Sequence, residues 1–123
     1  MNPDLIQPQA QEVEVELLGI MILYPEVVDE LNINASLFYS TRHQVIYEAI
    51  RKLSASSTLD TATLTMYLRD KGQLDEAGGL MYVSKLTDYG ISSTKAEQLV
   101  AVLEQKYLRR EYIKVAQMLS TLA

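Results

Sequence analysis

Residues 94–119 have the sequence TKAEQLVAVLEQKYLRREYIKVAQML and lie in a run, 91–123, that contains neither glycine nor proline. Thr94 followed three residues later by Glu97 forms a capping box, the pattern typical of a helix start. A helix from Lys95 to about Leu119 would be roughly 37 Å long, which is more than a small domain can cover. We therefore expect its end to project from the rest of the chain.

The apolar residues of this helix continue to its end. They are Leu99, Leu103, Tyr107, Leu108, Tyr112, Ala116 and Leu119. Because an exposed apolar stripe is unfavourable in water, we expect the projecting part to be buried against another helix or subunit.

Upstream of this helix, apolar periodicity, capping residues and glycines predict five shorter helices. Their expected positions are Gln9 to Tyr24, Pro25 to Leu31, Thr41 to about Leu53, Asp60 to Gly72 and Leu80 to Tyr89. The first of these helices has an expected inner face of Val13, Leu17, Ile20 and Tyr24. Thr41 and Gln44 form a predicted capping box at the start of the third, and Asp60 caps the fourth, which Gly72 ends. We predict an all-α fold, a compact orthogonal bundle of about six helices. Residues 1–8 are expected to form a flexible leader, 9–92 a globular head and 93–123 the projecting helix.

Composition restricts the class of protein. The chain has 123 residues, 48% of them hydrophobic and 22% charged, which is typical of one globular domain. The apolar run from Leu17 to Tyr24 is too short to span a membrane, so a cytoplasmic protein is expected. Cysteine is absent and His43 is the single histidine, which excludes thiolate sites and most metal or catalytic-triad chemistry.

Charge is unevenly distributed along the chain. Residues 1–94 carry 6 Lys and Arg against 13 Asp and Glu, a balance of −7, whereas residues 95–123 carry 5 against 3, a balance of +2. An acidic body repels phosphate backbones, because nonspecific nucleic-acid binding depends on Lys and Arg. Strong direct DNA binding is therefore not expected.

Few residues suggest chemistry. The glycines fit neither GxxxxGK[ST] nor GxGxxG, so we expect no ATP binding and no cofactor in this chain. On a helix Glu12 and Glu16 share a face and Glu14 points away, which indicates a solvated acidic helix start or a partner-facing acidic patch. A surface or half-buried structural role is expected for His43.

Two side-chain groups fit more than one role. The eight tyrosines suit core edges or interface anchors. The basic cluster of Lys106, Arg109, Arg110 and Lys114 is either a solvated face paired with Glu104 and Glu111 or a contact for an acidic partner or neighbouring subunit.

Several spaced motifs occur in a fixed order along residues 9–119. They are Glu12-x-Glu14-x-x-Leu17-Leu18-Gly19; Phe38-Tyr39 with His43-x-x-Ile46-Tyr47-x-Ala49-Ile50 and Leu53; Leu59-Asp60-x-x-Thr63 with Leu68; Gly72-x-Leu74-x-x-x-Gly78-Gly79-x-x-Tyr82-x-x-Leu86; and Glu104-x-Lys106-x-x-Arg109-Arg110. The ordered set resembles the N-terminal domain of DnaB-type bacterial replicative helicases, most specifically in the glycine pair followed by Tyr82.

The resemblance implies a small helical head followed by a helical hairpin through which subunits pair in the collar of a hexameric ring. It also implies a docking surface for primase, and a helicase loader is a further candidate partner. By resemblance Glu12 and Tyr82 lie on the primase-facing surface. The implied subunit interface contains Tyr107, Arg109, Arg110, Tyr112, Ala116 and Leu119. ATP, magnesium and helicase activity belong in that family to a motor domain that this chain lacks.

Two alternatives stay open on the sequence. The helicase-binding domain of primase has a similar fold, and a standalone replication loader or regulator could carry the same head. A small hydrolase using Glu12 or Glu14 with His43 is disfavoured, because the sequence offers no convergent catalytic site.

Overall fold

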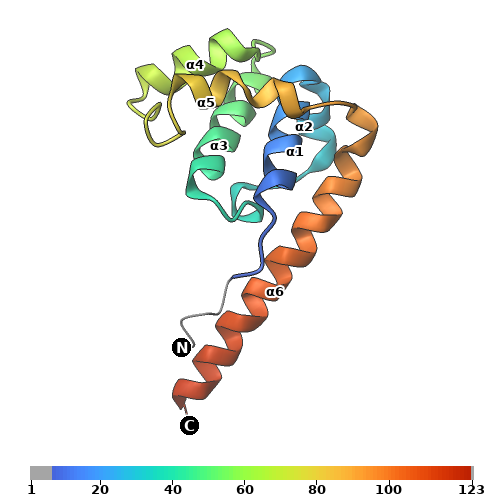
Figure 1. The fold of residues 1–123 in the computed structure, drawn as a ribbon, viewed down its shortest axis with the longest axis vertical. Coiled ribbons are helices and arrows are strands. Elements are labelled where there is room, and N and C mark those ends of the chain that lie inside the picture. The colour runs from blue at the N-terminus through green and yellow to red at the C-terminus, as the bar shows by residue number, and fades with distance from the viewer. Residues whose placement is uncertain (1–6, 123) are drawn as a thin grey trace.

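The computed structural model describes residues 7–122, so most of the leader predicted at residues 1–8 lies outside the described residues. Between residues 7 and 122 the chain is helical and contains no β-strand. The elements are α1 (Gln11–Leu23), α2 (Glu26–Leu31), the 3-10 turn η1 (Ala35–Leu37), α3 (Thr41–Ala55), α4 (Thr61–Asp70), α5 (Leu80–Ser84), the 3-10 turns η2 (Leu86–Tyr89) and η3 (Ser93–Lys95), and α6 (Ala96–Leu122). The elements before α6 form a head, and α6 leaves it as a long helix whose second half stands clear (Figure 1). The all-α prediction is confirmed. Within the described part, no helix is both long and apolar enough to cross a bilayer.

Helix α1 is the centre of the head. All six residues from Leu17 to Ile22 are buried, although they point in every direction around the helix. A helix that is apolar all round has to be covered on all sides. The single inner face predicted for α1 was therefore too narrow, and Val13 and Tyr24 at its ends are only half-buried.

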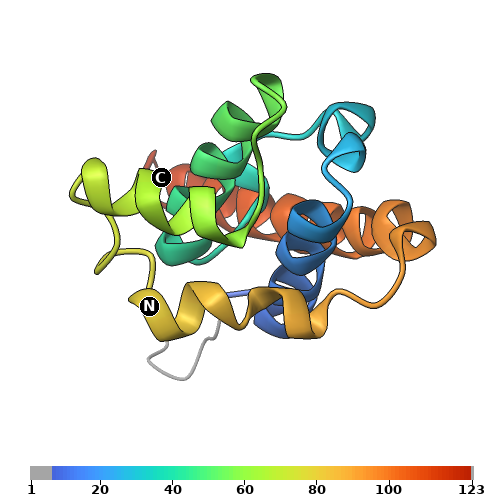
Figure 2. The ribbon, with the colours of Figure 1, turned by 90° about the horizontal axis from the view of Figure 1, so that it is seen from above.

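Two glycines allow α1 and η2 to touch through their backbones. A Cβ on Gly19 would collide with the carbonyl oxygen of Leu86 and would lie 2.9 Å from the Gly90 nitrogen. A Cβ on Gly90 would lie 2.5 Å from the Gly19 carbonyl carbon. Seen from above, the segment from α5 to η2 crosses beside α1 at this point (Figure 2). The close crossing places η2 next to the first turns of α1.

We expect Gly19→Ala to destabilise the head by about 2–3 kcal/mol, because backbone atoms cannot move aside as a flexible side chain can. Chemical denaturation with circular dichroism would measure the change. Gly72→Ala is the comparison, since an added Cβ there meets no atom within 4 Å and its smaller loss, about 1 kcal/mol, comes only from placing alanine at a φ of 70°. Equal stability of Gly19→Ala and wild type would contradict the close crossing.

The helix starts agree with the sequence only in part. Asp60 caps α4 as predicted: its carboxylate accepts from the Thr63 N–H at 2.8 Å, and the Thr63 hydroxyl accepts from the Asp60 N–H. Hydrogen bonds from Thr63, chiefly its backbone N–H, lower the pKa of the Asp60 carboxyl, so this stabilisation is present at neutral pH and is lost as the pH falls through the lowered pKa. Gly72 follows α4 at φ 70°, in the left-handed region expected there.

The capping box predicted at Thr41 and Gln44 is wrong. Thr41 is the first residue of α3, and Ser40 at the N-cap makes no side-chain cap hydrogen bond. The Gln44 amide instead donates to the Phe38 carbonyl at 2.8 Å. The Gln44 side chain therefore bonds the loop before α3 and does not reach back to cap the helix.

Two more boundaries differ from prediction. The helix expected from Leu80 to Tyr89 is broken into α5 and η2, and the chain between them turns at Lys85. Thr94 does not cap α6, because it lies inside η3, where its N–H donates to the Ser92 hydroxyl at 3.3 Å. Helix α6 consequently begins at Ala96 and ends at Leu122, three residues later than predicted.

Candidate functional site

An open groove of about 290 Å³ lies between α1 and the α5–η2 segment. Its lining is mainly apolar and carries one acidic and one basic side chain; the residues are Glu12, Val15, Tyr82, Lys85, Leu86 and Tyr89. The close crossing of α1 and η2 brings these side chains together. Glu12 and Tyr82, which the family resemblance places on one partner-facing surface, line the same groove.

Tyr82 is held at three points. Its ring lies against Gly78, where a Cβ would come within 2.8 Å of two ring carbons. The Arg42 guanidinium carbon lies 4.6 Å from the ring centroid, within cation–π range. The hydroxyl oxygen lies 2.6 Å from Nε2 of His43. Gly78 in the glycine pair is thus required by the space that Tyr82 occupies and by its own φ of 105°.

Behind Tyr82 lies a buried acid–imidazole pair. Nδ1 of His43 donates to Oε1 of Glu14 at 2.7 Å, and both side chains are essentially inaccessible to solvent. The expectation of a surface or half-buried His43 is wrong. Glu14 does point away from Glu12 and Glu16, but it points into the core, so the solvated interpretation does not hold for this residue.

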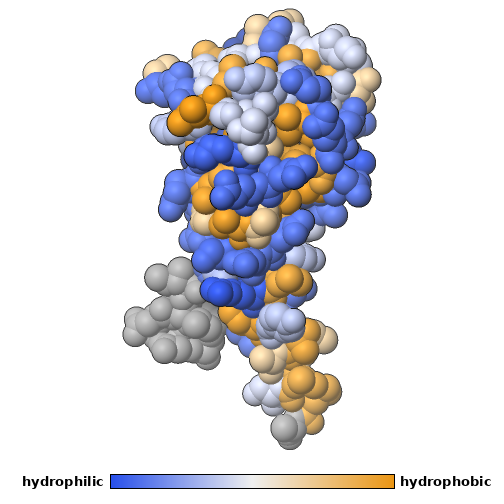
Figure 3. All heavy atoms as spheres, turned by 90° about the vertical axis from the view of Figure 1, so that its right-hand side faces the viewer, coloured by the Kyte–Doolittle hydropathy of each residue, from blue (hydrophilic) through white to orange (hydrophobic). Residues whose placement is uncertain are grey.

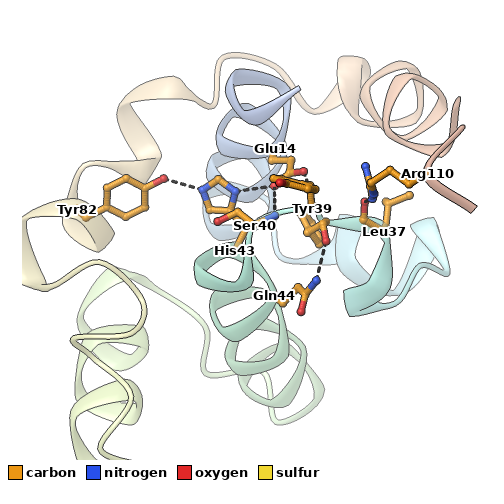
Figure 4. A network of polar contacts seen from close by, with 9 residues as sticks. Glu14, Leu37, Tyr39, Ser40, His43, Gln44, Tyr82 and Arg110 are labelled. Atoms are coloured by element: carbon orange, nitrogen blue, oxygen red, sulfur yellow. Dashed lines mark hydrogen bonds and ion pairs between the residues drawn. The ribbon is translucent and has the colours of Figure 1, made fainter. Parts of the chain in front are cut away.

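The Glu14 carboxylate also supports the start of α3 (Figure 4). It accepts from the backbone N–H of Tyr39 at 2.7 Å and from that of Ser40 at 3.4 Å. Ser40 is the N-cap of α3 and Tyr39 directly precedes it, so the carboxylate lies at the positive end of the helix dipole. Glu14 supplies the acceptor that the predicted capping box of α3 does not.

Glu14 and His43 are two of the residues that a small hydrolase could use as catalytic groups, and the fold brings them into contact. Glu14 has three donors around it and His43 has a partner on each ring nitrogen, and both are closed off from solvent. This arrangement can orient Tyr82, but it presents no free base or nucleophile to a substrate. Among residues 7–122 there is no cluster of three or more His, Cys, Asp or Glu side chains suited to a metal ion.

Arg110 ties α6 to the head. Its guanidinium donates to the carbonyl oxygens of Pro8 at 2.8 Å and of Leu37 at 3.2 Å. It also lies 5.5 Å from the ring centroid of Tyr39 and 5.9 Å from that of Tyr107. Arg110 therefore lies against Leu37 and Tyr39 of the head (Figure 4) and is not part of a solvated basic face. Tyr107 is half-buried.

Replacing Arg110 by methionine keeps the aliphatic stem and removes the donors. We expect Arg110→Met to destabilise the folded chain by about 2 kcal/mol, because two charge-assisted hydrogen bonds to carbonyls are lost. Thermal unfolding would measure this. The neighbouring exposed Arg109 gives the matched control, and equal losses for Arg109→Met and Arg110→Met would contradict the assigned contacts.

The other basic residues of the cluster are closer to solvent. Lys114 pairs with Glu111 at 3.3 Å, as expected for a surface pair. Arg109 is exposed and Lys106 is half-buried. The four cations therefore do not act as one patch.

Helix α6 has two apolar faces rather than one. The first, made of Ala96, Leu99, Val100 and Leu103, is buried against the head. The second is exposed on the free half of the helix, and we call it the α6 stripe: Leu108, Tyr112, Val115, Leu119 and Leu122. At about 100° per residue the two faces are centred roughly 130° apart. The predicted single stripe thus joined residues from two faces.

The α6 stripe has the spacing of a coiled-coil seam. Its members alternate at four and three residues, and Tyr112 and Leu122 are 72% and 82% exposed. Apolar atoms dominate the free end of the helix in the space-filling view (Figure 3). Ala116 is exposed beside the stripe, and after Leu103 no described residue of α6 is fully buried.

Residues 6–105 match the family described as the DnaB-like helicase N terminal domain. The chain belongs to this family. This match favours the N-terminal domain of a DnaB-like helicase over the helicase-binding domain of primase, the alternative left open by the sequence. The resemblance inferred from the motifs is thereby confirmed.

Curated relatives of this DnaB-type domain are replicative DNA helicases DnaB. The relative from Rhodothermus marinus is 35% identical over 85% of this chain and 12% of its own length. The relative from Geobacillus stearothermophilus is 32% identical over 90% of this chain and 25% of its own length. The chain thus spans about an eighth to a quarter of the length of these relatives.

Solved structures share the fold. The N-terminal domain of DnaB helicase from Mycobacterium tuberculosis superposes with a TM-score of 0.86 at 25% identity, covering 94% of this chain and 86% of that one. A DnaB-like replicative helicase, whose structure was described together with its interactions with primase, superposes with a TM-score of 0.76 at 23% identity and covers 89% of this chain and 26% of that one. The second likeness supports the fold alone.

Proposed function

We propose that this chain is the collar and primase-docking domain of a hexameric replicative DNA helicase. The observation that carries the docking part is the groove that places Glu12 and Tyr82 side by side. The resemblance to DnaB-type helicases implies that both residues face primase. A mainly apolar groove with a charged residue at its rim is typical of a protein–protein contact.

The known relatives and the shape of the groove support this role. One structural neighbour is a DnaB-like helicase described with primase. The walls of the groove offer two tyrosines, Tyr82 and Tyr89, and aromatic residues are common anchors at interfaces. The rim charges Glu12 and Lys85 would fix the orientation of the partner rather than supply most of the affinity.

Calorimetric titration with the C-terminal domain of a bacterial primase tests the docking proposal. We expect Tyr89→Ala and Glu12→Arg each to weaken binding by about tenfold or more, since one removes an anchor and the other reverses a rim charge. Met66→Ala is the control, because Met66 is 58% exposed on α4 and does not line the groove. Unchanged affinity in both groove variants would refute docking at this site.

The collar part of the proposal rests on the α6 stripe. A protein in water rarely leaves such a continuous apolar seam uncovered, and a second copy of the helix is a suitable cover. Arg109 is the basic residue that lies exposed beside Leu108 and would flank the seam. The same stripe explains why subunits would pair through this helix.

We further propose that ATP hydrolysis and strand translocation reside outside this chain, in the remainder of a longer helicase. The sequence has no phosphate-binding loop, and the acidic head disfavours contact with DNA. Calorimetry with millimolar Mg-ATP is expected to show no saturable heat, and any DNA binding is expected to vanish at moderate salt. Micromolar binding of Mg-ATP, or tight binding of single-stranded DNA at physiological ionic strength, would contradict this.

A further inference from the structure

We infer that the buried Glu14–His43 pair is a positioning device for the groove, which holds the Tyr82 hydroxyl inward so that a partner meets the tyrosine ring and not its hydroxyl. The inference rests on the proposed docking function for its binding consequence. Its geometric part concerns only Glu14, His43 and Tyr82. Neither Glu14 nor His43 lines the groove, so both act through Tyr82.

The direction of each hydrogen bond follows from the partners of Glu14. The carboxylate accepts from the backbone N–H groups of Tyr39 and Ser40, and because a carboxylate can only accept, Nδ1 of His43 donates to it as well. We assign the single imidazole proton to Nδ1, which leaves Nε2 as an acceptor. The Tyr82 hydroxyl at 2.6 Å donates to it.

This bond occupies the polar end of Tyr82. Because the hydroxyl proton is directed at a completely buried nitrogen, a groove ligand could use it only by breaking the bond to His43. The ring is fixed from other sides by Gly78 and by Arg42. A ligand in the groove therefore finds Tyr82 in one preset orientation, which lowers the entropic cost of binding.

The chain also shows why an acid is needed at residue 14. A glutamine there would have to direct its NH₂ group either at Nδ1 of His43 or at the Tyr39 N–H, and both of these are donors. Loss of the first bond would release the His43 proton to move to Nε2. The Tyr82 hydroxyl would then lose Nε2 of His43 as its hydrogen-bond acceptor, although no residue that lines the groove had been replaced.

Nitrogen-15 NMR of His43 and detection of the Tyr82 hydroxyl proton in the full chain test the geometric part. In wild type we expect a protonated Nδ1, an unprotonated Nε2 and a slowly exchanging hydroxyl proton. Tyr82→Phe should shift the Nε2 signal, whereas Tyr89→Phe, which removes a hydroxyl from the same groove, should not. Glu14→Gln should abolish the slow hydroxyl proton, and Glu16→Gln two residues along α1 should preserve it.

Titration with the primase C-terminal domain tests the binding consequence. We expect Tyr82→Phe to bind about two- to tenfold more weakly, the effect of one lost orienting hydrogen bond. We expect the His43 Nε2 signal of wild type to stay unchanged in the complex. A shift of Nε2 towards its unbonded value on binding would show that the partner takes the hydroxyl, and would overturn the inference.

Failure of the two proposals can be told apart. If wild type does not bind primase, the docking function fails, while the NMR of the free protein still decides whether Glu14 and His43 orient Tyr82. If Glu14→Gln does not fold, the comparison of Tyr82→Phe with Tyr89→Phe decides it. A rapidly exchanging Tyr82 hydroxyl in wild type would refute the positioning role in every case.

Discussion

Glu14→Ala is expected to destabilise the head by about 3–5 kcal/mol, because removal of a buried, hydrogen-bonded carboxylate leaves three donors without an acceptor. The groups left are Nδ1 of His43 and the N–H groups of Tyr39 and Ser40. A domain of this size has a total stability of roughly 5–15 kcal/mol. The variant should therefore unfold some 10–25 °C below wild type.

Differential scanning calorimetry measures this loss, and Glu16→Ala is its matched control. Glu16 lies on the same helix and pairs with Lys95 at 3.1 Å on the surface. Loss of a surface pair costs about 1 kcal/mol or less. Similar melting temperatures for Glu14→Ala and Glu16→Ala would show that the buried network contributes little.

The sequence predicts those parts of the fold that depend on local patterns. The cap formed by Asp60, the left-handed Gly72 and the long uninterrupted α6 follow from residues close together in the chain. These capping, terminating and periodic residues all lie within a single turn or a single helix. They identify the fold class and most of the helices.

Local patterns fail where a partner comes from a distant element. Glu14 and His43 are 29 residues apart, and His43 and Tyr82 are 39 apart. Nothing near Glu14 or His43 in the sequence shows that the two side chains meet. Local patterns therefore indicate a solvated Glu14 and a surface or half-buried His43. The missing cap of α3 has the same cause, because its acceptor belongs to α1.

The candidate groove was predictable in part for a related reason. Glu12 and Tyr82 could be assigned to one surface only through a family resemblance, since 70 residues separate them in the sequence. Lys85 and Tyr89 carried no such signal, and they join the groove because η2 turns after α5 and crosses α1 at Gly19. For α6 the helical period predicted from the sequence is correct. The predicted apolar stripe, however, combined residues of the face buried against the head with residues of the exposed α6 stripe.

Replacing Tyr112 or Leu119 by aspartate is expected to abolish self-association while the head stays folded. Both side chains are exposed on the free half of α6, so a charge there meets no core atoms in the single chain. In a dimer the same charge would lie in the apolar seam, where an unpaired carboxylate is strongly unfavourable. We expect the wild-type dimer to have a Kd of roughly micromolar or higher, and each variant to raise that Kd by about a hundredfold or more.

Sedimentation at high protein concentration, together with circular dichroism for folding, distinguishes the outcomes. Ser120→Asp is the matched control: it adds the same charge next to Leu119, but Ser120 lies about 100° further around the helix and outside the α6 stripe. It should associate like wild type. If Tyr112→Asp and Leu119→Asp kept the wild-type association state, the α6 stripe would not be the seam. If either unfolded the head, the free half of α6 would have to pack against the head in solution, which would contradict its exposure in the structure.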